Sequence, residues 1–212
     1  MMNKNVIAAN EIIGNDVVKA LKRRGFEAEY VSTGSEALKR ILEIIPKDAT
    51  VGIPGTVTIR DIGALDALKE RGNVVYQHWG SMSNEERRIA RFKENEADVF
   101  LTSANALTRD GQIINIDGTG NRVAGMAWGE GLVLFVIGIN KLAFDLTDGL
   151  KRARSATIPN AIRQKVETAC VKAGHCVNCL NDESMCRAIL ILEQAVKGRQ
   201  YHVIIVGESL GY

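Results

Sequence analysis

Four cysteines lie close together in the C-terminal third of the chain. Cys170, Cys176, Cys179 and Cys186 are all the cysteines of the protein, and they follow the spacing C-x5-C-x2-C-x6-C. The two-residue gap between Cys176 and Cys179 lets two thiolates reach one metal centre. Four thiolates suit a [4Fe–4S] cluster or a structural Zn²⁺, and the neighbouring His175 could replace a ligand or support one. The spacing predicts a cluster or metal site without deciding iron from zinc; free thiols or two disulfides are the alternatives.

A turn rich in glycine and threonine is a second candidate site. Residues 51–63 read VGIPGTVTIRDIG, a strand that leads through a turn into a helix. Gly55 allows close backbone approach, Thr56 and Thr58 offer hydroxyl donors, and a helix N-terminus presents unpaired amides. Such a turn suits a phosphate or carboxylate. It is neither a Walker loop nor the dinucleotide-binding Gly-x-Gly-x-x-Gly. An ordinary strand–helix connection is an equally good interpretation.

A short polar loop after a strand is the third candidate. It reads Asp117, Gly118, Thr119, Gly120, Asn121 and Arg122. Ligand loops of α/β sheets follow strands in this way, and Arg122 could hold a carboxylate or phosphate through two hydrogen bonds. Lys141, after the apolar run 132–137, could face the same cleft, although a lone lysine there is usually solvated. The alternative is a tight turn in which Asp117 caps the next helix. We expect Thr56 and Arg122 to lie around one hollow at one edge of the sheet.

Other polar residues near these segments carry weaker signals. His78 follows a strand and could line the cleft, but a half-buried loop histidine is the more common case. The charged run that includes Arg87 is most simply the solvated face of a helix.

Strands and helices alternate along the first 145 residues. We expect strands near 27–31, 50–53, 73–76, 98–102, 113–116 and 132–137, with helices near 17–24, 35–45, 59–68 and 83–95. This alternation predicts an α/β fold, a largely parallel sheet with helices on both faces. Residues 146–170 are expected to be helical with a break at Pro159. The runs 188–192 and 202–206 are expected to pair as antiparallel strands, although the first could be helical.

Composition limits the class of protein. The chain has 212 residues, 46% hydrophobic and 25% charged, as in a soluble globular domain, and we expect one domain over 1–212 with a cysteine module at 168–187. A net charge of +2 and 5% aromatic residues argue against nucleic acid as a partner. No apolar run is long enough to cross a bilayer and no secretory signal is evident, so we expect a cytoplasmic protein without a membrane partner, in a compartment that disfavours disulfides.

Several of these segments together resemble one family. SANALTRDG at 103–111, INIDGTGNRVA at 114–124, GINK at 138–141 and GTVTIRDIG at 55–63 are similar to the LUD-domain (lactate utilisation protein, former DUF162) family. The resemblance runs from about residue 10 to the C-terminus. It implies a Rossmann-like fold related to NagB/RpiA/CoA-transferase-like proteins. In that superfamily a similar turn helps bind phosphosugars or nucleotides, which implies ligand roles for Gly55, Thr56 and Thr58.

The resemblance also implies a metabolic role. Some family members belong to a multi-protein system, rich in iron–sulfur clusters, that oxidises L-lactate to pyruvate. This chain resembles the small single-domain members with a cysteine module, and it lacks the tandem CxxCxxCxxxCP motifs of the large subunit and an evident glutamate nucleophile of the CoA-transferase type. We therefore expect a protein of lactate or small-hydroxyacid utilisation. It would bind a small anionic metabolite, neutralised by Arg122 and Lys141, and carry a [4Fe–4S] cluster or zinc.

Partners and alternatives follow from the same resemblance. Redox partner subunits of a lactate-oxidising system and a homodimer are expected partners, the dimer from base rates alone. The alternatives are a non-catalytic accessory protein with a structural metal, or an acyl- or phosphosugar-type transfer enzyme. The sequence does not decide whether the protein is catalytic, because one fold hosts unrelated chemistries.

Overall fold

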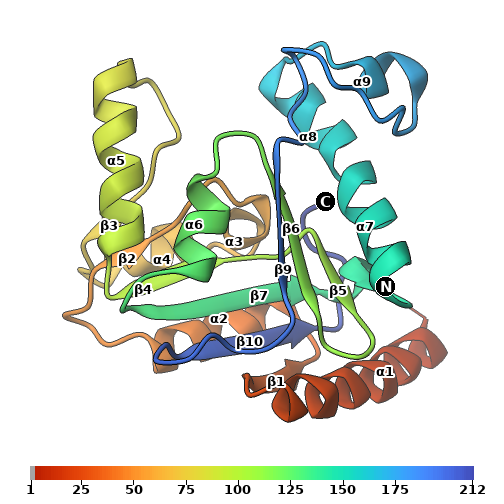
Figure 1. Cartoon of the computed structure of the whole chain (residues 1–212). Helices are drawn as coiled ribbons and strands as arrows, with labels where there is room; N and C mark the ends of the chain where they lie inside the picture. The colour runs from red at the N-terminus through yellow and green to blue at the C-terminus, as the bar shows by residue number, and fades with distance from the viewer. Residues whose placement is uncertain (1–2) are drawn as a thin grey trace.

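A six-stranded parallel sheet forms the centre of the molecule. The computed structural model describes residues 3–212. The strand order is β1-β10-β7-β4-β2-β3, and every neighbouring pair is parallel. The strands are β1 (Glu27–Val31), β2 (Val51–Gly52), β3 (Val75–Tyr76), β4 (Val99–Thr102), β7 (Leu132–Gly138) and β10 (Tyr201–Val206). The predicted α/β fold with a largely parallel sheet is confirmed (Figure 1).

A smaller mixed sheet packs beside the first. Its order is β8-β5-β6-β9, with β5 and β9 antiparallel to β6 and β8 parallel to β5. The strands are β5 (Ala106–Thr108), β6 (Ile113–Asp117), β8 (Leu142–Ala143) and β9 (Ala188–Leu192). Gly111, with φ at +94°, closes the turn between β5 and β6.

The expected antiparallel pairing of 188–192 with 202–206 is wrong, although both segments are strands. β9 pairs with β6 in the small sheet, whereas β10 lies between β1 and β7 in the large one. Burial explains the difference. β10 is buried along almost its whole length, as a central parallel strand must be, whereas β9 keeps a partly exposed face.

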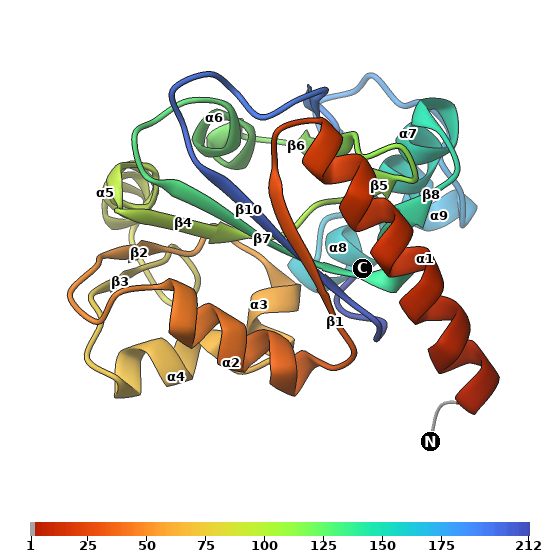
Figure 2. The same ribbon diagram turned by 90° about the horizontal axis from the view of Figure 1, so that it is seen from below.

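Helices cover both faces of the large sheet. The side chains of β7 alternate between two hydrophobic cores: Val133, Phe135 and Ile137 pack in one, and Leu134 and Val136 pack in the other. The first core also receives α1 (Lys4–Arg23), α6 (Asn121–Ala127) and the small sheet, and the second receives α2 (Gly34–Ile44), α3 (Val57–Asp61) and α4 (Ala64–Glu70). Figure 2 shows α2, α3 and α4 together on one side of the sheet. The long helix α5 (Asn84–Glu96) contacts β2 and β3 at the edge.

The C-terminal helices form an upper lobe with the cysteine segment (Figure 1). They are α7 (Leu146–Ser155), α8 (Thr157–Gln164) and α9 (Ala169–Ala173), and a 3-10 turn, η1 (Ile139–Lys141), follows β7. The helical region breaks at Ala156 and not at Pro159. Pro159 lies in the first turn of α8, where a helix tolerates the missing backbone N–H.

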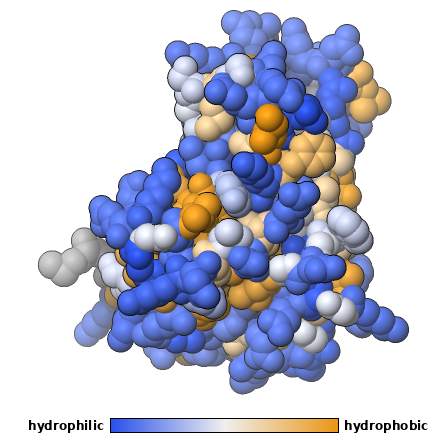
Figure 3. All heavy atoms as spheres, turned by 90° about the vertical axis from the view of Figure 1, so that its left-hand side faces the viewer, coloured by the Kyte–Doolittle hydropathy of each residue, from blue (hydrophilic) through white to orange (hydrophobic). Residues whose placement is uncertain are grey.

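The outer surface is mainly polar on the side that carries α5. Figure 3 shows hydrophilic side chains over most of this side, with smaller hydrophobic patches between them. Within residues 3–212, no helix combines the length and the hydropathy that a bilayer crossing requires.

Candidate functional site

A cavity of about 620 Å³ opens beside the carboxyl ends of β2, β3 and β4. Gly55, His78 and Asn105, which follow these three strands, line its floor. The cavity is lined by α5, by the start of α6, by α8 and by the segment before β9; Figure 1 shows α5 and α8 on opposite sides, with α6 between them. The volume falls within the range of about 300–1,000 Å³ that is usual for small-molecule sites. The position is the one where open α/β sheets bind ligands.

Five arginines line this cavity: Arg87, Arg91, Arg122, Arg163 and Arg187. Only Arg122 forms an ion pair, with Asp117; within residues 3–212 the other four have no carboxylate partner. The Nε atoms of Arg91 and Arg163 are buried and have no hydrogen-bond partner there. Buried donors without acceptors are costly, and an anionic ligand would supply the missing acceptors.

The loop after β6 fixes Arg122 against Asp117. The Arg122 backbone N–H donates to Asp117 Oδ2 at 2.9 Å, and its Nε and Nη2 donate to Asp117 Oδ1, each at 3.3 Å. Nη2 also donates to the Ile116 carbonyl at 2.6 Å. Asp117 therefore caps α6 and orients the guanidinium at once, and Nη1 is not used in these bonds. Gly120, with φ at +82°, lets the chain turn into α6.

An aromatic ring between two guanidinium groups forms another part of the wall. The Arg60 and Arg163 guanidinium carbons lie 4.0 and 4.3 Å from the centroid of the Trp79 ring. Burial lowers the pKa of both arginines, and the charge of Arg163 lowers the pKa of Arg60 further. These stacked arginines hold Trp79 in place beside Gly55.

His78 forms a hydrogen-bonded pair with a buried glutamate. Its Nδ1 lies 2.7 Å from Glu94 Oε1 and 3.0 Å from Oε2. Glu94 is completely buried, and burial raises the pKa of its carboxyl group, while the bond to His78 lowers it in part. Gly52 makes this burial possible, because a Cβ at that position would collide with the backbone of Glu94. The close contact between β2 and α5 thus places the carboxylate behind the histidine.

Lys141, Thr56 and Thr58 do not line the cavity. Lys141 is 3% exposed, and its Nζ donates to Thr58 Oγ1 at 2.8 Å and to Ser103 Oγ at 3.0 Å. Burial lowers the pKa of Lys141 to about 7, and the charges of Arg152 and Arg122 act in the same direction. We call Lys141, Thr58 and Ser103 the lysine cluster. Gly211 packs against it, since a Cβ there would lie 3.3 Å from Lys141 Nζ.

The structure brings together part of the predicted ligand set. Six of its members line the cavity: Gly55, Asp117, Gly118, Thr119, Asn121 and Arg122. Gly120 shapes the loop without lining the cavity, as described above. The ligand role of each of these residues stays a prediction.

Sequence analysis missed most of the arginines. Arg87 and Arg91 lie four residues apart on α5 and therefore on one helix face. Like charges at this spacing destabilise an isolated helix, and this repulsion is the sequence feature that could have indicated an anion site. No sequence feature marked Glu94 as a site residue, because its burial depends on Gly52, which is distant in the sequence.

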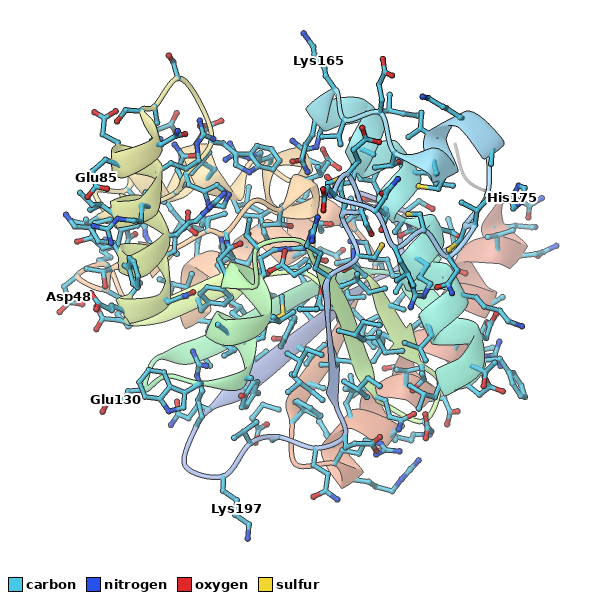
Figure 4. All side chains as sticks on the ribbon, turned by 45° about the horizontal axis from the view of Figure 1, so that its top comes forward. Asp48, Glu85, Glu130, Lys165, His175 and Lys197 are labelled. Carbon is cyan, nitrogen blue, oxygen red and sulfur yellow. The ribbon has the colours of Figure 1, made fainter. Side chains whose placement is uncertain are left out.

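The four cysteines are free and lie in the upper lobe. Burial raises the pKa of Cys186, and the charges of Cys176 and Cys170 raise it further, so these thiols lie near enough to interact. Within residues 3–212, however, no three His, Cys, Asp or Glu side chains form a group that could hold a metal ion. His175 is exposed at the outer edge of the lobe (Figure 4). The thiols have the right chemistry, but this arrangement is not a formed coordination site.

Comparison with known proteins gives the family. The family model of the LUD domain matches residues 15–206. The crystal structure of a DUF162 family protein from Deinococcus radiodurans is similar, with a TM-score of 0.53 and 13% identity over 93% of this chain and 98% of that chain. At this identity the likeness shows a shared fold. No curated protein matches the chain. Because the family match covers most of the sequence, the protein belongs to the LUD-domain family.

Proposed function

We propose that this LUD-domain protein binds a small anionic metabolite of lactate or small-hydroxyacid utilisation in the cavity between α5 and α8. The observation that carries the proposal is the set of five cavity arginines, of which only Arg122 has a carboxylate partner within residues 3–212. Clustered like charges repel one another, and a bound anion removes that repulsion. The thiols of the upper lobe are free, as in proteins of a reducing compartment.

Two features of the wall favour a carboxylate-bearing ligand. A guanidinium presents its donors in a fixed fork that matches the two oxygens of a carboxylate. The unpartnered Nε atoms of Arg91 and Arg163 come from opposite walls of the cavity, one on α5 and one on α8. An anion between them would be held from two sides.

Calorimetric titration of the protein with L-lactate and with pyruvate tests this function. We expect Arg91→Gln to weaken binding about tenfold, because a hydrogen bond to a charged group contributes about 1.5–3 kcal/mol. Arg88→Gln is the matched control, since Arg88 is on the same helix but exposed and paired with Glu85; its effect should stay below about twofold. Absence of binding, or equal affinities for the wild type and Arg91→Gln, would contradict the proposal.

We also propose that Cys170, Cys176, Cys179 and Cys186 hold a [4Fe–4S] cluster or zinc, and that redox partner subunits exchange electrons with a cluster if one is present. The support is the gathering of four free thiols in one short segment. Because the thiols are not in a coordinating arrangement, residues 174–186 must close around the metal.

Purification without oxygen, followed by metal analysis and a visible spectrum, tests the cysteine module. A cluster should bleach with dithionite and recover with an oxidant, whereas zinc gives no visible band. Replacement of Cys176 by serine should remove most of the metal. Protein that contains neither metal and has four thiols open to alkylation would contradict this proposal without affecting the anion site.

A further inference from the structure

We infer that His78 transfers a proton to and from the ligand in the arginine-lined cavity, and that Glu94 positions it. The inference deepens the proposed function and rests on it. It also narrows the ligand class to anions that carry a hydroxyl or carbonyl oxygen next to the anionic group, such as a 2-hydroxy acid or a 2-oxo acid.

The first argument is the direction of the hydrogen bond between the two residues. Glu94 is an acceptor when it is ionised, and both of its oxygens lie within 3.0 Å of His78 Nδ1. With Glu94 ionised, Nδ1 carries the proton, and in the neutral ring Nε2 carries the lone pair. Within the described chain, Glu94 has no ion pair with an arginine or a lysine, so His78 is its closest charged partner, and the charge of Arg91 acts on it from further away.

The second argument is the space beside Nε2. His78 lines the cavity, and within residues 3–212 its Nε2 has no hydrogen-bond partner. Gly55 faces this atom: a Cβ at Gly55 would lie 3.4 Å from Nε2 and 2.8 Å from Trp79 Nε1. The glycine is needed for its φ of +43° and also leaves room for a ligand atom next to the ring.

The third argument is the charge around the pair. Arg91 and Glu94 are three residues apart on α5, so the anion-binding guanidinium and the positioning carboxylate share one helix face. Arg87 Nη1 donates to the His78 carbonyl at 3.2 Å and holds the loop against the same helix. Arg122 with Asp117, and Arg163 on α8, line the same cavity. When an anion is bound by these arginines, the hydroxyl or carbonyl oxygen next to its anionic group lies in the part of the cavity that His78 Nε2 faces.

The proton transfer balances within the ligand and the pair. The ligand hydroxyl gives its proton to Nε2, which leaves an alkoxide on the ligand and an imidazolium on His78. The Glu94 carboxylate stabilises the imidazolium, and the surrounding arginines stabilise the alkoxide. In the reverse direction the imidazolium returns the proton to the oxygen. A buried carboxylate that orients a histidine in this way is the arrangement of a general base.

A second histidine–glutamate pair in the molecule provides a control. His202 Nε2 lies 2.8 Å from Glu29 Oε1, but both residues are outside the cavity and bridge two strands of the large sheet. The residue types of the pair are the same, but the Glu29 side chain is part-exposed and also pairs with Arg40. Any ligand effect that is specific to the cavity must therefore be absent from His202.

The experiment compares L-lactate with propionate, which has the same carbon skeleton without the hydroxyl. Their affinities are measured by calorimetry for the wild type, His78→Asn and His202→Asn. Asparagine keeps a donor for Glu94 and removes only Nε2. We expect the wild type to prefer lactate about tenfold, the ratio expected from one hydrogen bond to an ionisable group. His78→Asn should bind both acids equally, and His202→Asn should keep the wild-type ratio.

Nitrogen-15 NMR on the full chain supplies a second readout, the protonation of each histidine ring nitrogen, which a purely structural role of His78 would not link to the ligand. The protein has three histidines, so the ring signals are assigned by the two variants. We expect the His78 proton on Nδ1, and a shift of the Nε2 signal when lactate but not propionate saturates the cavity. Glu94→Gln should move the proton partly to Nε2.

The outcomes separate this inference from the function on which it rests. Binding of lactate and propionate with equal affinity, both weakened by Arg91→Gln, would overturn the role of His78 and leave the anion site in place. A proton on Nε2 in the wild type would overturn it as well. Failure of either acid to bind would overturn the proposed function and this inference together.

Discussion

The carboxyl edge of the large sheet carries two regions with basic side chains, one open to solvent and one closed. The cavity holds five arginines around an open volume of about 620 Å³. The lysine cluster, made of Lys141, Thr58 and Ser103, is closed by Gly211 and leaves Lys141 only 3% exposed. In both regions a basic side chain lies near other positive groups: burial and then the charges of Arg152 and Arg122 lower the pKa of Lys141, and burial together with the charge of Arg122 lowers the pKa of Arg163 in the cavity.

The difference follows from the chemistry of the two side chains. A guanidinium stays protonated at any pH at which the protein is folded, so its positive charge must be solvated by water or paired with an anion. An ammonium can lose its proton and become a neutral amine that burial tolerates. The open site therefore suits a charged ligand, whereas the closed site needs none.

The largest effect that this comparison predicts is on the pH dependence of stability. The pKa of Lys141 is about 7 in the folded protein against 10.5 as its ordinary value. Between these values the unfolded chain binds the proton that the folded chain has released, so the free energy of unfolding rises with pH. The full difference corresponds to about 5 kcal/mol, an upper estimate. Urea unfolding of the wild type and Lys141→Met from pH 6 to 10 should show the contribution of this lysine in the wild type only.

The matched control for that experiment is Lys39→Met. Lys39 is on the surface of α2, with its side chain 78% exposed. This variant should keep the wild-type pH dependence, which includes the titration of tyrosines and cysteines. An unchanged slope in Lys141→Met would mean that the lysine keeps its proton when buried, and the contrast between the two regions would fail.

A smaller effect is expected from opening the closed region. A Cβ at Gly211 would lie 2.5 Å from Thr58 Oγ1, and its φ of +59° is unfavourable for other residues. Gly211→Ala should destabilise the protein by about 1–3 kcal/mol, the usual range for overpacking. It should also raise the rate at which Lys141 reacts with acetic anhydride, measured by mass spectrometry, by about tenfold.

Gly63→Ala separates the contact from the backbone strain. Gly63 has a similar φ of +73°, but a Cβ there would meet nothing within 4 Å. Its cost should therefore be only the conformational one, about 1 kcal/mol, with no change at Lys141. Equal effects of the two variants would show that Gly211 does not seal the lysine cluster.

Sequence alone predicts the fold better than it predicts these two regions. Alternation of strands and helices is a local pattern, and it indicates the parallel sheet and the strand 132–137 correctly. The partner of a strand is not local: β9 and β10 are close in the chain but lie in different sheets, because burial on both faces draws only β10 into the centre.

The same distinction applies to the sites. The loop 117–122 carries its polar residues in one stretch and is visible in the sequence, and most of it lines the cavity. Arg163 and Arg91 reach the cavity from helices that are far apart in the chain, so no window of sequence contains both. The burial of Lys141 depends on Gly211, a glycine seventy residues later in the chain, and on Thr58, which lies in the N-terminal third.

The smallest predicted effect is a gain in stability from removing one cavity arginine. Without a ligand, Arg91 has a buried Nε with no acceptor within residues 3–212 and lies among four other arginines. Arg91→Gln should therefore raise the free energy of unfolding by a few tenths to about 1 kcal/mol, as is common when a binding residue is lost. Arg88→Gln, on the same helix, breaks the exposed pair with Glu85 and should lower the free energy of unfolding slightly. Urea unfolding in dilute buffer measures both, and added salt should reduce both differences. If the cavity is built for an anion, the two variants should change the free energy of unfolding in opposite directions, because only the removal of an unpaired charge stabilises the protein. A loss of stability in both variants would mean that solvent alone satisfies the cavity arginines.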